Sequence, residues 1–292
     1  MIKLVACDLD GTLLDENHQL PQRNIQAIHK LQQAGISFMA ATGRNYQSVA
    51  PMFEKEGIRC DCLLLNGALI TDADGNRRSH TPMPLDIAAA ALRILEESTL
   101  PYHMYTSEGI VSSAPEKGRE MFIRHMRKQG MQDEEIRELM EESSFGCYDR
   151  EIKDAFLYLR EEPIIYKLEA FGDDAEGLHA LRAQLTQVEH TAVTNSVADN
   201  IEITASGAQK GLALKKLCRE QGLQPDEVMV FGDSLNDLSM MQEFRHSFAM
   251  ENAADIIKEA AGYQTLSNAK HGVAHVLEQL IAAASEKRVS NL

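Results

Sequence analysis

The sequence lacks any long apolar run, internal repeat or low-complexity tract. A helix that spans a bilayer needs about 20 consecutive apolar residues, so we expect no membrane-spanning segment. The opening residues, MIKLVACDLDG, hold only a short apolar run before charged residues follow, which does not fit a secretory signal peptide. These absences predict a cytoplasmic protein that does not bind membranes.

Basic residues are also scarce: 29 Lys and Arg stand against 44 Asp and Glu, for a net charge of −15. The field of such a chain repels a long polyanion, so we expect no nucleic-acid partner. A small anionic substrate remains compatible with this charge if a few cations converge on one site.

The five cysteines provide no disulfide framework, because their number is odd and their spacing is scattered. They are Cys7, Cys60, Cys62, Cys147 and Cys218. The pair Cys60 and Cys62 lacks a second pair that would complete a zinc site. We therefore expect reduced thiols, which fits a reducing cytosol.

Four short apolar runs are present, and each ends in polar residues or glycine. They span residues 2–8, 36–43, 62–68 and 227–233. Continuous apolar runs of this length are typical of parallel strands buried on both faces. Helical patterns cover residues 21–34, 46–56 and 210–221. Strands that alternate with helices predict an α/β fold with a Rossmann-like parallel sheet.

The middle of the chain has a different pattern. Residues 102–113 predict a hairpin, residues 116–143 a charged helical stretch, and residues 164–170 and 191–204 further strands. The four methionines of the helical stretch predict packing rather than cofactor contact. They are Met121, Met126, Met131 and Met140. We expect residues 84–204 to form an α+β domain inserted into a core of residues 1–83 and 205–292.

Each predicted core strand delivers polar residues at its carboxyl end, where ligands bind in open α/β sheets. These residues are Asp8, Asp10, Thr42, Gly43, Asn66 and Asp233. Asp8 and Asp10 lie two apart on an extended strand, so their side chains point the same way. Two facing carboxylates repel each other unless a cation lies between them, which favours Mg²⁺.

Two further stretches leave alternatives open. Thr42, Gly43 and Arg44 could hold a phosphate oxygen, or Thr42 could simply cap a helix. Lys210 stands at the start of a predicted helix, which is the unfavourable end for a cation. This position suggests a nearby anion, although a solvated lysine is the simpler interpretation. The P-loop order of residues is absent here.

The stretch FGDSLND, residues 231–237, also resembles the opening block of a class of serine esterases. That interpretation requires Ser234 to have a histidine base, and those enzymes carry a D-x-x-H pair near the C-terminus. The D-x-x-H here runs from Asp15 to His18, upstream of the block. The order is wrong, so Asp233 as a metal ligand explains the stretch better.

Together the motifs resemble the haloacid dehalogenase superfamily. The resemblance rests on four ordered motifs, DLDGT (8–12), ATGR (41–44), KG (210–211) and GDSLND (232–237). Stretches at 66–68, 249–253 and 271–274 are similar to landmarks of its Cof-type sugar-phosphatase branch. The resemblance covers residues 1–83 and 205–292. Cys7 departs from the larger residue that the branch more often has there.

The resemblance implies an Mg²⁺-dependent phosphatase of small phosphorylated metabolites, with sugar phosphates the expected class. Asp8 becomes an aspartyl-phosphate and Asp10 serves as acid and base, while Asp237 orients Lys210 or a water on the metal. The implied phosphate contacts are Thr42, Gly43, Lys210 and Asn236. The implied metal ligands are Asp8, the backbone of Asp10 and Asp233. Arg44 and Asn66 are candidate substrate contacts.

About ten residues separate Asp10 from the helix near Pro21, too few for a lid, so the insertion is expected to cover the site. Two alternatives remain: a sugar phosphomutase with the same core, and a catalytically idle protein that binds phosphorylated ligands. We expect a monomer or a weak homo-oligomer.

Overall fold

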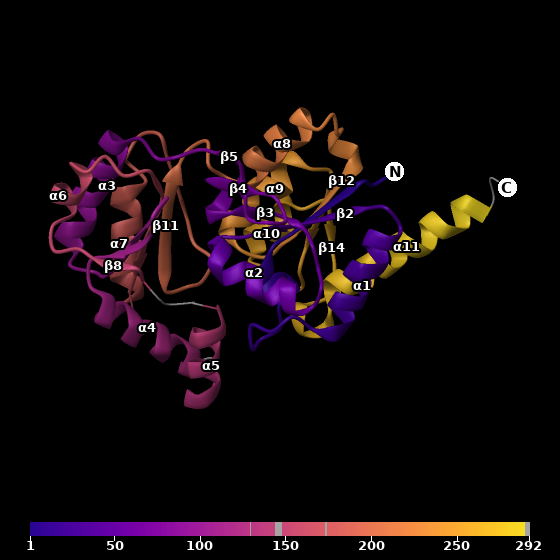
Figure 1. Ribbon diagram of the computed structural model, residues 1–292, viewed down its shortest axis with the longest axis horizontal. Helices are drawn as coiled ribbons and strands as arrows, with labels where there is room; N and C mark the ends of the chain where they lie inside the picture. The colour runs from indigo at the N-terminus through magenta and orange to yellow at the C-terminus, as the bar shows by residue number, and fades with distance from the viewer. Residues whose placement is uncertain (129, 144–147, 173, 290–292) are drawn as a thin grey trace.

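The computed structural model describes residues 1–128, 130–143, 148–172 and 174–289. Two sheets lie side by side, each with its own helices (Figure 1). The larger sheet has eight strands in the order β14-β13-β12-β1-β2-β3-β4-β5. These strands are β1 (Leu4–Cys7), β2 (Ser37–Ala41), β3 (Asp61–Leu64), β4 (Leu69–Thr71), β5 (Arg77–His80), β12 (Val228–Gly232), β13 (His246–Ala249) and β14 (Tyr263–Gln264).

The four predicted core strands are present as β1, β2, β3 and β12, and they are neighbours in parallel register. The structure adds β13 and β14 at one edge, and an antiparallel pair, β4 and β5, at the other. The added strands are short, and β5 reads RRSH with no apolar residue, so the sequence pattern could not reveal them. The predicted fold class is confirmed.

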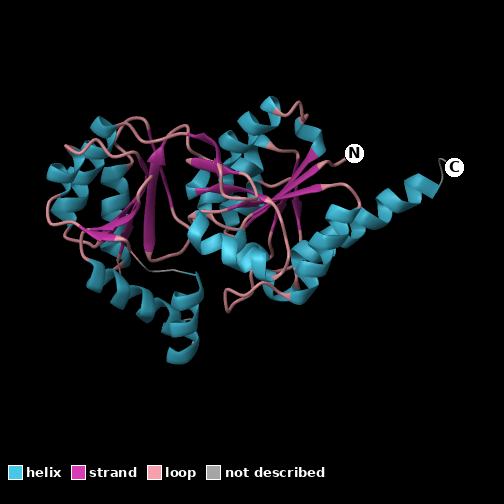
Figure 2. Cartoon of the chain, in the orientation of Figure 1, coloured by secondary structure: helices cyan, strands magenta, loops and turns pink. Residues whose placement is uncertain are grey.

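Helices lie on both sides of this sheet (Figure 2), and α1 packs against α11 while α8 packs against α9. The helices of this part are α1 (Gln22–Gln33), α2 (Tyr46–Lys55), α8 (Lys210–Glu220), α9 (Leu238–Glu243), α10 (Asp255–Ala260) and α11 (Gly272–Val289). Short turns of helix are η1 (Leu9–Leu13), η2 (Leu65–Gly67), η3 (Pro225–Glu227), η4 (Leu235–Asp237) and η5 (Asn268–Lys270). Every residue of β1 and β12 is buried, as parallel strands covered on both faces require.

The second sheet has the order β10-β11-β9-β6-β7-β8 and is antiparallel except between β7 and β8. Its strands are β6 (Tyr102–Thr106), β7 (Gly109–Ser112), β8 (Arg150–Glu151), β9 (Ile165–Phe171), β10 (Thr191–Thr194) and β11 (Asn200–Ala205). Helices α3 (Leu85–Ser98), α6 (Ala155–Leu159) and α7 (Ala175–Leu185) pack with it around a separate apolar cluster. We call residues 84–204 the cap.

The helical stretch predicted over 116–143 is two helices, α4 (Pro115–Lys128) and α5 (Asp133–Ser143). Gly130 between them has a φ of 93°, a conformation that ends a helix. Met126, Met131 and Met140 pack in one small cluster, as expected for packing residues. Met121 lies outside that cluster and, with Met126, lines a chamber beside the site described below.

Within the described part of the chain, no helix is both long and apolar enough to cross a membrane. Cys7, Cys60, Cys62 and Cys218 are buried free thiols. Cys147 lies outside the described residues.

Candidate active site

Asp8 follows β1 at the carboxyl edge of the parallel sheet and is only 4% exposed. Its backbone N–H donates to the carbonyl of Phe231 in β12, so two adjacent strand ends fix its position. The chain then turns at Gly11, where φ is 76° and an added Cβ would lie 2.4 Å from an Asp233 carboxylate oxygen. Glycine at this position therefore allows β1 and β12 to bring their aspartates together.

Lys210, the first residue of α8, is completely buried between two carboxylates. Its Nζ lies 2.6 Å from Asp8 Oδ1 and 2.7 Å from Asp237 Oδ1. Burial alone would lower the pKa of Lys210, but Asp237 and Asp8 raise it above its usual range. The interpretation of Lys210 as a solvated lysine is wrong: it is a fixed cation beside Asp8.

Asp8, Asp233 and Asp237 place carboxylate oxygens within 4.8 Å of one another. Burial and the charge of Asp237 raise the pKa of Asp233 to about 7, and the same two causes raise the pKa of Asp8 well above its usual range. One ammonium group faces three carboxylates here. The site therefore has a deficit of positive charge, which a divalent cation with oxygen ligands would balance.

Asp237 holds the loop after β12 in shape. Its Oδ2 accepts the backbone N–H groups of Asp233, at 2.9 Å, and of Ser234, at 3.1 Å. Its Oδ1 faces Lys210. Asp237 therefore contacts Lys210, which is one of the two partners that the family resemblance implied for it.

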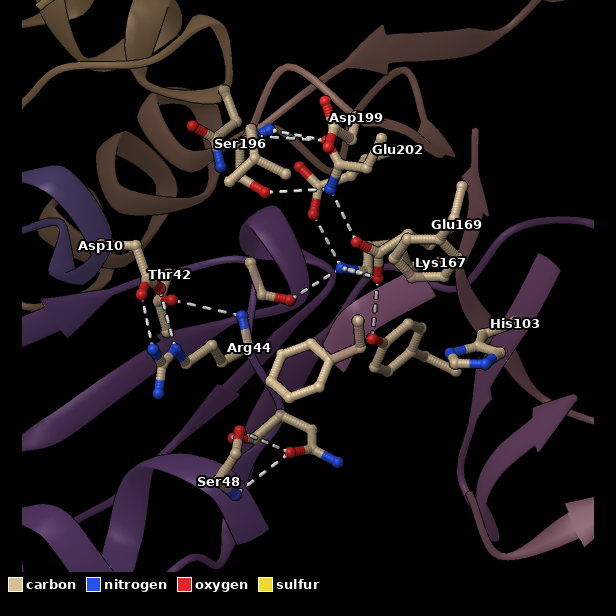
Figure 3. A pocket seen from close by; sticks show the side chains of 18 of the residues that line it. Asp10, Thr42, Arg44, Ser48, His103, Lys167, Glu169, Ser196, Asp199 and Glu202 are labelled. Atoms are coloured by element: carbon tan, nitrogen blue, oxygen red, sulfur yellow. Dashed lines mark hydrogen bonds and ion pairs between the residues drawn. The ribbon is translucent and has the colours of Figure 1, made fainter. Parts of the chain in front are cut away.

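The Asp10 carboxylate lies apart from the other three, although Asp10 is only two residues from Asp8. Arg44 Nε donates to Asp10 Oδ2 at 2.8 Å and Arg44 Nη2 contacts Oδ1 (Figure 3), while His18 Nδ1 lies 2.8 Å from Oδ1. Burial alone would raise the pKa of Asp10, but Arg44 and His18 hold it far below its usual range. Asp10 is therefore ionised in this arrangement.

His18 was missed in the sequence, where it stands in a polar loop. The structure brings its ring to Asp10 from eight residues downstream. Its φ is 56°, so the loop turns sharply at this residue. Nothing local in the sequence marks that turn, and no signal there could have placed His18 in the site.

Thr42 and Gly43 follow β2 and border the same space. Asn45, not Thr42, caps α2: its side chain accepts the Ser48 N–H at 3.1 Å. The helix-cap interpretation of Thr42 is wrong, and its hydroxyl instead accepts the Arg44 N–H at 3.2 Å. At Gly43 an added Cβ would meet a Glu202 oxygen at 2.8 Å, so only glycine fits this close to β11.

Asn66 and Asn236 link the core to the cap. Asn236 Nδ2 donates to Asn66 Oδ1 at 3.1 Å, and Asn66 Nδ2 donates to Glu202 at 3.0 Å. Asn66 adopts a left-handed conformation with a φ of 58°, which asparagine tolerates. The Oδ1 atom of Asn236 is buried and has no hydrogen-bond partner among the described residues, and Asn236 lines the space that Gly43 borders.

The cap contributes a buried polar network that the sequence analysis missed. Lys167 Nζ lies 2.9 Å from the Gly43 carbonyl oxygen, 2.7 Å from Glu202 and 3.0 Å from Glu169 (Figure 3). Lys167 and Glu169 lie two apart in β9, so both point to the same face of the cap sheet. This alternation is visible in the sequence, but it is also typical of a sheet face exposed to solvent.

Ser234 lies beside Asp233 without the partners of a nucleophile. Its Oγ is 2.9 Å from Asp233 Oδ2 and 3.2 Å from the Ser196 carbonyl oxygen in the cap. No histidine hydrogen bonds to Ser234 among the described residues. The geometry around Ser234 therefore does not support the esterase interpretation.

A sequence model of the haloacid dehalogenase-like hydrolases matches residues 5–277. The chain belongs to this family. The fold agrees: a solved haloacid dehalogenase-like hydrolase from B. subtilis superposes with a TM-score of 0.86 at 29% identity, covering 96% of this chain and 100% of that one.

Named relatives of this haloacid dehalogenase-like hydrolase are phosphatases. The phosphatase YwpJ of Bacillus subtilis (strain 168) is 32% identical over 290 residues, covering 96% of this chain and 100% of the relative. A second B. subtilis relative, the 5-amino-6-(5-phospho-D-ribitylamino)uracil phosphatase YwtE, is 29% identical over 286 residues, covering 96% of this chain and 99% of the relative. The chain is a phosphoric monoester hydrolase of this family, acting on small phosphorylated molecules.

Proposed function

We propose that the protein hydrolyses phosphate monoesters of small metabolites with Mg²⁺ and through an aspartyl-phosphate on Asp8. The observation that carries this proposal is the position of Asp8, whose carboxylate is held at 2.6 Å by buried Lys210 beside Asp233 and Asp237. A carboxylate fixed in this way can attack phosphorus, and the covalent intermediate divides one difficult step into two.

The donor set fits Mg²⁺, a hard ion that takes oxygen ligands. Asp8 and Asp233 would hold the ion, together with the backbone carbonyl of Asp10. Asp237 directs its oxygens to Lys210 and to two backbone N–H groups, so it supports the site rather than binding the ion. When bound, Mg²⁺ neutralises the charge that builds up between Asp8 and the phosphoryl group.

Thr42, the backbone of Gly43 and Asn236 are proposed to hold phosphoryl oxygens. Lys210 adds the positive charge that reduces repulsion between Asp8 and the phosphate dianion. The Asn236 amide N–H group now donates to Asn66 Oδ1, so a phosphate contact would use its second N–H or replace this bond.

Asp10 is proposed to protonate the leaving oxygen and then to take a proton from the attacking water. To act as an acid, Asp10 must carry a proton, but its contacts with Arg44 and His18 disfavour the protonated carboxyl. Substrate binding therefore has to weaken the ion pair between Asp10 and Arg44. A phosphoryl group beside Thr42 and Gly43 would compete with Asp10 for Arg44, which frees the carboxyl to act.

We also propose that residues 84–204 act as a cap over a core of residues 1–83 and 205–292. Two contacts support this role: Lys167 reaches the Gly43 carbonyl, and the cap loop at Ser196 reaches Ser234. A cap in this position keeps bulk water from the intermediate and contacts the leaving group. Sugar phosphates as the substrate class, a monomer or weak homo-oligomer and a cytoplasmic location stay predictions.

Turnover of p-nitrophenyl phosphate tests the proposed function. We expect phosphate release that requires Mg²⁺ and disappears after exhaustive EDTA treatment. Activity that survives EDTA would contradict the metal requirement, and no turnover at all would favour a protein that only binds phosphorylated ligands. Strong stimulation by a sugar bisphosphate would favour the phosphomutase.

A further inference from the structure

His18 contacts the proposed acid Asp10, although no step of the proposed mechanism requires it. It stands in the loop between η1 and α1, and its side chain is only 11% exposed. Its ring borders the same space as Asp8 and Asp10. The 2.8 Å between His18 Nδ1 and Asp10 Oδ1 is an ordinary hydrogen-bond distance. A polar ring in this position can fix the orientation of the Asp10 carboxyl group.

The loop that carries His18 is organised by Asp15. Asp15 Oδ1 accepts the backbone N–H groups of Asn17, at 2.9 Å, and Gln19, at 3.0 Å. The backbone N–H of His18 donates to the Asp15 carbonyl oxygen at 3.1 Å. His18 has a φ of 56°, in the left-handed region that histidine, asparagine and aspartate enter more readily than most side chains. These bonds hold the backbone of His18 in place, and its ring is held toward Asp10 as a result.

The two carboxylate oxygens of Asp10 have different partners (Figure 3). Oδ1 faces both His18 Nδ1 and Arg44 Nη2. Within the described part of the chain, Oδ2 accepts only from Arg44 Nε, at 2.8 Å. A carboxylate oxygen accepts and cannot donate, so His18 Nδ1 carries the hydrogen, whether the ring is neutral or charged. Withdrawal of Arg44 would therefore free Oδ2 and leave Oδ1 held by His18.

The same contacts determine which oxygen of Asp10 can carry the hydrogen that the acid step uses. A hydrogen on Oδ2 opposes the N–H of Arg44 Nε, which points at the same atom, but it leaves the bond from His18 to Oδ1 intact. A hydrogen on Oδ1 would instead oppose the N–H of His18. Competition of a phosphoryl group for Arg44 therefore prepares Oδ2, and not Oδ1, for the acid step.

Building on the proposed function, in which Asp10 protonates the leaving oxygen, we infer that His18 is a positioning residue that holds Asp10 Oδ1 and so presents Oδ2 to the leaving group. The hydrogen on Oδ2 passes to the leaving oxygen as the bond from that oxygen to phosphorus breaks and the bond from Asp8 to phosphorus forms. Asp10 is then a carboxylate, with Oδ1 still bonded to His18 and Oδ2 open to the attacking water. The imidazole neither gains nor loses a proton.

The test uses two esters that each carry one aromatic ring but differ in their need for an acid. p-Nitrophenyl phosphate releases a stabilised anion, whereas benzyl phosphate releases an alkoxide that has to be protonated. For both esters kcat/KM covers the steps up to departure of the leaving group, so the later hydrolysis of the aspartyl-phosphate does not enter. We expect His18→Ala to lower kcat/KM for benzyl phosphate about tenfold or more, with p-nitrophenyl phosphate within about twofold of the parent enzyme.

Two further variants separate the hydrogen bond from the fold of the loop. His18→Asn keeps a side-chain N–H and tolerates the left-handed conformation, so it should restore kcat/KM for benzyl phosphate to within about threefold of the parent enzyme. Asn17→Ala alters an exposed residue of the same loop and should change neither ester. Thermal unfolding checks each variant, and His18→Gly, which relaxes the same backbone position, replaces His18→Ala if that variant does not fold.

Three results would overturn the inference: equal losses of His18→Ala on both esters, no loss on benzyl phosphate, or a His18→Asn variant as impaired as His18→Ala. Asp10→Asn tests the proposed function separately and should be severely impaired on benzyl phosphate. If it is impaired while His18→Ala is not, the proposed function stands and the inference fails. If Asp10→Asn hydrolyses benzyl phosphate normally, or the parent enzyme hydrolyses neither ester, the proposed function fails and the inference fails with it.

Discussion

The core and the cap each bury one lysine between two carboxylates, and the two lysines differ in what surrounds them. Lys210 in the core faces Asp8 and Asp237, and Lys167 in the cap faces Glu169 and Glu202. Burial alone would lower the pKa of either lysine, and in each case the carboxylates raise it above its usual range.

The carboxylates around the two lysines have different further partners. In the cap, Glu169 accepts from Tyr105 at 2.7 Å and from Asn200 at 2.7 Å, and Glu202 accepts from Asn66 at 3.0 Å. In the core a third carboxylate, Asp233, joins the pair and raises the local negative charge. The cap network is therefore closed by hydrogen bonds, whereas the core cluster keeps an excess of negative charge that an added cation would balance.

The largest predicted effect falls on the core. Asp8→Asn should lower kcat by about 10⁴-fold or more, because an amide is a poor nucleophile and no other described group replaces it. Steady-state turnover of p-nitrophenyl phosphate measures this loss, and circular dichroism checks the fold. Asp226→Asn, on the exposed turn before β12, is the control and should keep full activity. Normal turnover by Asp8→Asn would rule out the covalent route.

A smaller but still large effect is expected at Asp233. Asp233→Ala removes one proposed anionic ligand of the metal and should lower phosphatase activity about 10²-fold or more at ordinary Mg²⁺ concentrations. Activity should recover in part at high Mg²⁺. Ser234→Ala in the next position should cost at most about tenfold, the scale of one hydrogen bond. An Mg²⁺ titration of both variants makes the comparison. The esterase interpretation predicts the opposite ranking, with Ser234→Ala inactive on a carboxyl ester.

In the cap the main effect should be on stability. Lys167→Met leaves Glu169 and Glu202 buried without their cation and should cost about 3–5 kcal/mol in the free energy of unfolding. Adding Glu169→Gln and Glu202→Gln removes both charges and should restore part of that loss. Thermal unfolding of the single and triple variants measures both effects. A single variant as stable as the parent would show that the network does not support the cap.

The smallest predicted effect concerns His103, whose pKa is lowered by burial and by Lys167 to about 4. Because the unfolded chain binds a proton at His103 near pH 6.5, the stability linked to this residue is present above that pH and is lost toward pH 4. The loss is on the order of 3 kcal/mol. His103→Asn should lose less stability over this range, as denaturant titrations at several pH values would show. Identical pH dependence of the two proteins would contradict a lowered pKa of His103 in the fold.

The two lysines also differ in how far the sequence predicts them. The strand ends of a parallel sheet meet at one edge, so Asp8, Thr42 and Asp233 could be predicted to converge without a structure. For Lys210, the unfavourable place at a helix start suggested a nearby anion but left a solvated lysine open. Strands β4, β5, β13 and β14 could not be predicted, because they are short and partly polar.

The cap network could not be placed because its residues lie inside strands, not at strand ends. An alternation of polar and apolar residues in β9 and β11 is also what a solvent-exposed sheet face shows, and only the position of the cap over the core makes that face buried. The contact between Asp10 and Arg44 was missed for a related reason: sequence spacing does not show which partner a carboxylate selects.

The central claim, that Asp8 becomes phosphorylated during turnover, has one direct measurement. The enzyme is quenched in acid while it hydrolyses p-nitrophenyl phosphate, the acyl phosphate is reduced with borohydride, and the peptides are analysed by mass spectrometry. We predict homoserine in place of Asp8, only when substrate is present. Turnover with phosphate attached at Ser234 instead, and with Asp8 unmodified, would contradict the account.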